Sequence, residues 1–73
     1  MDQKTLIEYL IDEENRAIHL YRKCASEERD REMRSFLMDL SVAKEKHKWH
    51  LEEKRRSLDA SDSVTRQIND VYL

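Results

Sequence analysis

Residues 36–51, which read FLMDLSVAKEKHKWHL, decide the fold of this chain. Apolar side chains recur within and around this stretch at steps of three and four residues, the period of one face of an α-helix. Two ionisable residues, Lys44 and His47, interrupt that face midway. Because an unpaired charge in a core is costly, each needs a ligand or a compensating partner. The complete stripe comprises Met33, Leu37, Leu40, Lys44, His47, Leu51, Lys54 and Leu58.

The N-terminal third of the chain carries a matching stripe. The same steps predict a first helix that ends near Ala25, and one acid, Glu14, interrupts its apolar face near the centre. If the two helices pair antiparallel, Glu14 meets Lys44 and His47, so we expect a buried cluster of these three side chains. The stripe of the first helix comprises Leu6, Leu10, Glu14, Ala17, Ile18, Tyr21 and Ala25.

The segment between the two stripes predicts a turn. Residues 26–32 contain no apolar side chain, and Asp30 is a suitable N-cap for the second helix. One unbroken helix is the alternative, because no glycine or proline forces a break. The hairpin is favoured since a single rod leaves its stripe without a partner. At the N-terminus, Thr5 and Glu8 resemble a capping box, and Asp2 is the alternative cap for a slightly earlier start.

Small polar residues then predict a second turn at residues 57–63, followed by a short third helix from Val64 to Leu73. The expected fold is therefore all-α: one domain, residues 1–73, with an antiparallel two-helix hairpin and a short C-terminal helix. A chain of 73 residues buries too little surface to be comfortably stable alone. We expect it to form a homodimer, in which two hairpins complete a four-helix bundle, or a higher oligomer.

Composition excludes several classes of function. The formal net charge of -2 gives no electrostatic case for nucleic acid or an anionic membrane as a partner. No apolar run approaches the roughly twenty residues that span a bilayer, and no signal peptide opens the chain. The single cysteine, Cys24, is expected to be a half-buried structural residue, and it favours a reducing compartment. The sequence therefore predicts a cytoplasmic protein, or one enclosed in a larger assembly.

Two segments resemble helices of the rubrerythrin family within the ferritin-like proteins. Residues 14–21, ENRAIHLY, are similar to the Glu-x-x-Ala-x-x-x-Tyr helix of rubrerythrins, and residues 40–47, LSVAKEKH, are similar to their Leu-Ala-x-x-Glu-x-x-His helix. The layout of two long helices and a short third one is especially similar to the encapsulated ferritins. This resemblance implies half-bundles that dimerise around a di-iron centre and oxidise iron.

Carried over position by position, the resemblance implies iron as the cofactor and Glu14 and His47 as metal ligands. Lys44 departs from the family pattern, because it stands where the family has a bridging glutamate, and a cation there opposes metal binding. Lys44 therefore argues against a full di-iron centre. The resemblance also implies a shell protein as a further partner, although the shell-targeting extension of the encapsulated ferritins is not expected in a sequence that ends at Leu73.

Other readings stay open beside the metal site. Glu14 is about as well explained by an ion pair with Lys44, which makes the chain a metal-free structural or assembly module. A helical adaptor that binds a partner helix is a third interpretation. His19 is expected at the surface. His50 is expected on a flank or at the surface, and a zinc pair of His47 and His50, three residues apart, is the alternative, although no third or fourth ligand is evident. Trp49 falls beside the inward face and is expected to pack at an interface. No nucleophile, phosphate loop or cysteine cluster indicates another enzyme class.

Overall fold

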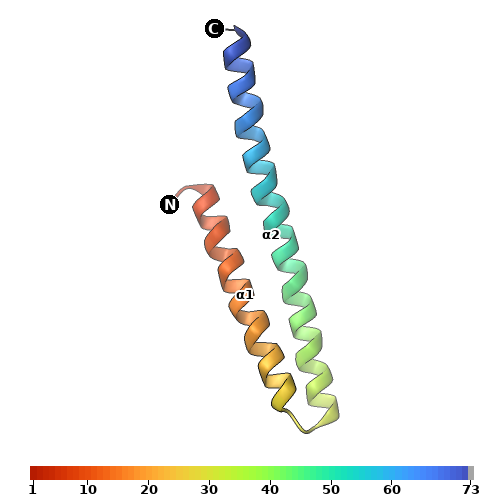
Figure 1. The fold of residues 1–73 in the computed structure, drawn as a ribbon. Helices are drawn as coiled ribbons and strands as arrows, with labels where there is room; N and C mark the ends of the chain where they lie inside the picture. Colours follow the sequence, from red (N-terminus) through yellow and green to blue (C-terminus); the bar gives the residue numbers. More distant parts are fainter. Residues whose placement is uncertain (73) are drawn as a thin grey trace.

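Two antiparallel α-helices make up the computed structural model of the chain (Figure 1). α1 spans Gln3–Glu27 and α2 spans Arg31–Tyr72. The structure describes the backbone of residues 1–72 and the side chains of residues 1–60. No strand occurs within that backbone, and the two helices pack along the whole of α1. The all-α hairpin predicted from the two stripes is confirmed.

Asp2, and not Thr5, is the N-cap of α1. Its carboxylate Oδ1 accepts a hydrogen bond from the backbone N–H of Thr5 at 2.7 Å, and its backbone is extended. This bond satisfies one of the N–H groups that the first turn of a helix leaves without a partner. The hydrogen bond to the ionised carboxylate holds the pKa of Asp2 below its usual range.

Removal of this cap should fray α1. We expect Asp2→Ala to speed amide exchange in the first turn, at Thr5 above all, while Asp2→Asn keeps the side-chain acceptor and most of the protection. Because the pKa of Asp2 is lowered on folding, its contribution is complete above the ordinary value of 3.8 and is lost as the pH falls through the folded-state value. Exchange measured by NMR should show this acid loss in the parent chain and not in Asp2→Asn.

The turn between the helices needs neither glycine nor proline. Glu28 ends α1 in an extended conformation, and no residue of the described backbone takes a positive φ. Asp30 then begins α2: its Oδ2 accepts from the Met33 N–H at 2.8 Å, as the sequence predicted. The Asp30 N–H itself donates to the Glu28 carboxylate at 3.1 Å. A backbone bond from the Glu28 N–H to the Ala25 carbonyl oxygen at 3.3 Å closes α1, so the chain reverses over three residues with a side-chain cap on α2 alone.

The predicted second turn at residues 57–63 and the separate third helix are wrong. α2 continues through this segment to Tyr72, so the fold has two helices and not three over the described backbone (Figure 1). Serine and aspartate cost only a few tenths of a kcal/mol each in a helix interior, and no glycine or proline is present to add a larger cost. The last residue of the predicted third helix, Leu73, lies outside the described residues.

The contact between the helices follows a spacing of four and three residues. On α1 the buried residues Ile11, Ile18 and Ala25 recur every seven positions, as in an antiparallel coiled coil. Leu6 and Leu10, which were expected in this contact, are exposed instead. The α2 side of this seam contains buried Ser41 and the half-buried residues Leu37, Lys44, Lys48, Leu51, Arg55 and Leu58.

This core is thin. Among the side chains that the structure describes, only Ile11, Ile18, Ala25 and Ser41 are buried. The molecule measures 65 × 19 × 12 Å, so it is a single layer of two helices. Apolar side chains on both long helices stay in contact with water, which a stable protein of this size normally avoids by association.

Candidate functional site

Glu14 lies midway along α1, where the heptad spacing places it at the edge of the seam. Its side chain is 18% exposed, and its Oε2 atom lies 3.6 Å from Nζ of Lys44 and 3.8 Å from Nδ1 of His47. The three residues that the sequence placed together are therefore neighbours in the structure. Oε2 is buried, and no hydrogen bond reaches it.

His47 does not lie inside the seam. Its side chain is 60% exposed, whereas that of Lys44 is 32% exposed, so the expectation of three buried side chains is wrong for the histidine. The reason is geometric. Lys44 follows the 4-3 spacing of Leu37 and Ser41, while His47 lies about 80° around α2 from the seam. In the single chain His47 therefore borders the seam and faces water.

A pocket of about 340 Å³ opens beside this cluster. Leu10 and Leu51 form part of its apolar wall, and Glu14 and His47 stand at one end. Its occurrence shows that these side chains from α1 and α2 share one side of the hairpin. The complete lining is Ile7, Leu10, Glu14, His47, His50, Leu51 and Lys54.

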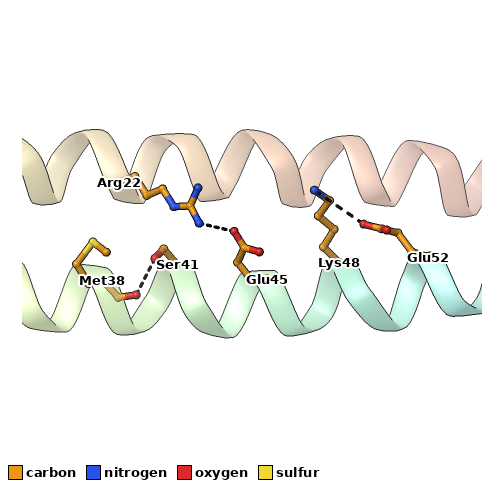
Figure 2. Close-up of polar contacts among 6 residues, drawn as sticks. All are labelled: Arg22, Met38, Ser41, Glu45, Lys48 and Glu52. Carbon is orange, nitrogen blue, oxygen red and sulfur yellow. Dashed lines mark hydrogen bonds and ion pairs between the residues drawn. The ribbon is translucent and has the colours of Figure 1, made fainter.

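The two sides of the seam differ in chemistry. On one side, ion pairs link the helices: Lys4 to Asp59 at 3.1 Å, and Arg22 to Glu45 (Figure 2). The other side, which contains the pocket, is mainly apolar. We call it the open flank. By helical spacing from Leu10 and His47, it comprises Leu6, Leu10, Ala17, Tyr21 and Cys24 of α1 with Met33, Phe36, Leu40, His47 and Lys54 of α2.

Figure 2 shows how α2 places polar groups in and beside the seam. The Ser41 hydroxyl donates to the Met38 carbonyl oxygen at 2.7 Å, which satisfies this buried side chain without a partner from α1. Lys48 reaches toward Glu52 of its own helix at 3.8 Å. Sequence reasoning did not single out Ser41; its signal is the step of four from Leu37 and of three to Lys44.

One chain by itself offers too few donors for a metal. No group of three histidine, cysteine, aspartate or glutamate side chains that could hold an ion occurs among the described residues. Glu14 and His47 supply one carboxylate and one imidazole, and Lys44 brings a positive charge to the same carboxylate. A second copy would double the donors to the four that a transition metal commonly takes in proteins.

The remaining candidates lie at the surface. His19 and His50 are exposed, as expected. The His50 and Trp49 rings pack edge to face, with their centroids 5.2 Å apart. Cys24 is exposed, so the expectation that it is half-buried is wrong. It lies just beyond the buried face of α1, about 100° from Ala25 on the helix wheel.

Comparison with protein-family models, curated proteins and solved structures found no match to this chain. Over the residues that the structure describes, neither helix combines the length and the apolar character required to cross a membrane.

Proposed function

We propose that the chain is a ferritin-like half-bundle that dimerises through its open flank and binds a divalent metal ion, iron by family resemblance, between the two copies. In this arrangement Glu14 and His47 of both chains supply the ligands. The observation that carries the proposal is the Oε2 atom of Glu14, which is buried, has no hydrogen-bond partner and lies beside an imidazole at the margin of the open flank.

Dimerisation is supported by the shape and the thin core of the hairpin. A single layer 12 Å thick leaves large apolar side chains in water, and those of the open flank come from both helices. A second hairpin laid on this flank about a twofold axis would convert one seam into the core of a four-helix bundle. Glu14 lies near the middle of the paired region, so the two copies of the cluster would meet close to that axis.

The donors fit a single divalent ion better than a di-iron centre. Two carboxylates and two imidazoles suit zinc or ferrous iron, but a bridging carboxylate is missing because Lys44 occupies its position. The Lys44 side chain is 32% exposed, and its long stem allows the ammonium group to turn toward water. Iron bound there would supply redox chemistry, whereas the residues of the chain bind and orient it.

A second candidate function is favoured by the ion pair itself. With Nζ of Lys44 3.6 Å from Glu14, the dimer would hold two acids and two ammonium groups, a neutral cluster that needs no metal. The protein would then be a metal-free assembly module with the same quaternary structure. The two candidates share the dimer and differ only in the metal.

Metal content and mass together test both candidates. We expect the protein loaded anaerobically with Fe²⁺, or with Zn²⁺, to retain about one ion per dimer after desalting, and Glu14→Gln to retain none. His19→Asn, which removes an exposed histidine away from the cluster, is the matched control and should retain the ion. A dimer without metal would select the metal-free module. A monomer by light scattering would contradict both candidates.

The open flank can be tested apart from the metal. We expect Leu10→Glu to dissociate the dimer, because a carboxylate would be buried among apolar side chains there. Leu20→Glu is the control, since Leu20 is 58% exposed and lies about 80° from Leu10 around α1. Sedimentation velocity should give a monomer for the first variant and a dimer for the second. Equal effects of the two substitutions would exclude the open flank as the dimer contact.

A further inference from the structure

A further apolar stripe lies on α2, on the other side of the seam from the open flank. It belongs neither to the seam nor to the open flank. It consists of Met38, Val42 and Trp49, which we call the outer stripe; they are 44%, 53% and 57% exposed. At about 100° per residue these positions fall within about 40° of one another, roughly 110° around α2 from the seam. An aromatic and two aliphatic side chains aligned in water are typical of a contact surface.

The outer stripe borders the ion-paired side of the hairpin. Glu45 lies next to it on the helix, and the Arg22 guanidinium of α1 neutralises that carboxylate (Figure 2). A partner placed on the stripe would therefore not meet an uncompensated acid. Because the stripe lies on one continuous helix and its three side chains are exposed, another helix fits it best.

We infer that the outer stripe binds the same stripe of a second copy, α2 against α2 and antiparallel, as a contact separate from the open flank. In an antiparallel pair of identical helices, two residues face each other when the mean of their numbers equals the residue number at the twofold axis. With the axis near residue 43, Met38 of one copy faces Trp49 of the other, and the two Val42 side chains lie near the centre. Sulfur and aromatic rings pack favourably.

The charges beside the stripe agree with the same axis. Arg34 and Glu52 lie on one border of the stripe, and their midpoint in sequence is residue 43; Asp39 and Lys46 lie on the other border, with their midpoint between residues 42 and 43. In an antiparallel pair each border faces the same border of the other copy. Arg34 therefore faces Glu52, and Lys46 faces Asp39, so opposite charges meet on both sides.

These charged groups are available for a contact between copies. Glu52 pairs with Lys48 within α2 at 3.8 Å, and Arg34 donates to the Arg29 carbonyl oxygen at 3.4 Å. The first joins two half-buried side chains, 32% and 31% exposed, and the second is a long bond to a neighbouring turn. Weak local interactions of this kind can be shared or exchanged. Three partly exposed apolar side chains per copy make a small interface, so the contact belongs to the weak class that forms at high concentration or links dimers already formed.

The only tryptophan of the chain, Trp49, reports on this contact directly. We expect its emission to move to shorter wavelength, and its quenching by acrylamide to fall at least twofold, as the chain concentration rises from micromolar to millimolar. Met38→Glu and Arg34→Glu should each abolish this dependence. The double variant Arg34→Glu with Glu52→Arg should restore it, because the charges of the facing borders are then exchanged in both copies.

Two results would overturn the inference. One is Trp49 emission that does not depend on concentration, which would assign the stripe to another partner or to none. The other is a dependence that the paired charge reversal fails to restore, which would exclude this register. Leu10→Glu keeps the outer stripe intact and should keep the concentration dependence, so failure of the open-flank dimer and failure of this contact give different outcomes. Circular dichroism checks that each variant remains helical.

Discussion

Lys44→Glu should strengthen iron binding at the cluster of Glu14, Lys44 and His47. The substitution places a carboxylate three residues before His47, on the same face of α2, and removes the ammonium group 3.6 Å from Glu14. In a dimer it would add two carboxylates to the four donors already present. We expect ferrous iron to bind at least tenfold more tightly than to the parent chain, and with up to two ions per dimer.

The same variant should be less stable than the parent without metal. Glu14, only 18% exposed, would lose its counter-charge and face a like charge, at a cost of about 1–3 kcal/mol after allowance for solvent screening at Lys44. Iron should restore this loss, since a ligand at a hundredfold excess over its Kd adds about 2.7 kcal/mol. Thermal unfolding of Lys44→Glu with and without Fe²⁺, under nitrogen, measures both effects.

Lys48→Glu is a closely matched control. Lys48 lies in the same seam with the same 32% side-chain exposure, but one turn further along α2. Its replacement adds an equal charge to the seam without completing the Glu-x-x-His spacing at His47. The unfolding temperature of Lys48→Glu should therefore fall, and addition of Fe²⁺ should not restore it. Equal iron binding by the two variants would show that added negative charge, and not the geometry of the cluster, attracts the metal.

Ile18→Ala should be the most damaging substitution in the seam. Ile18 is 3% exposed and lies at the centre of the three buried residues of α1. Removal of a buried isoleucine side chain costs about 2–5 kcal/mol, from lost burial and from the cavity that remains. Among the described residues Ile11 is the only other large side chain that is buried, so we expect the variant to be largely unfolded at room temperature.

Urea denaturation followed by circular dichroism, at constant chain concentration, measures this loss. Leu20→Ala is the control, because Leu20 is 58% exposed on the same helix and its truncation should change stability by about 0.5 kcal/mol or less. A parent-like midpoint for Ile18→Ala would mean that the contact between α1 and α2 does not hold the hairpin together. The dimer contact would then have to supply most of the stability.

Local patterns in the sequence account for most of the hairpin. The turn near Asp30 was predictable because residues 26–32 lack any apolar side chain, and the cap forms from a residue type that favours it. The proximity of Glu14, Lys44 and His47 was also predictable, because antiparallel pairing of the two stripes places the three residues at the same position along the hairpin axis. The unbroken course of α2 was not: serine and aspartate near residue 60 favour turns only weakly.

The sequence by itself determined the two helices, their reversal and the level at which an acid meets a lysine and a histidine, because these depend on periods of three and four residues and on capping. The tertiary structure decided which part of a broad apolar arc is buried. α1 is apolar from Leu6 and Leu10 round to Ile11 and Ile18, and one neighbouring helix covers only part of such an arc. Packing chose the isoleucines, and it left Leu10 and His47 on the open flank.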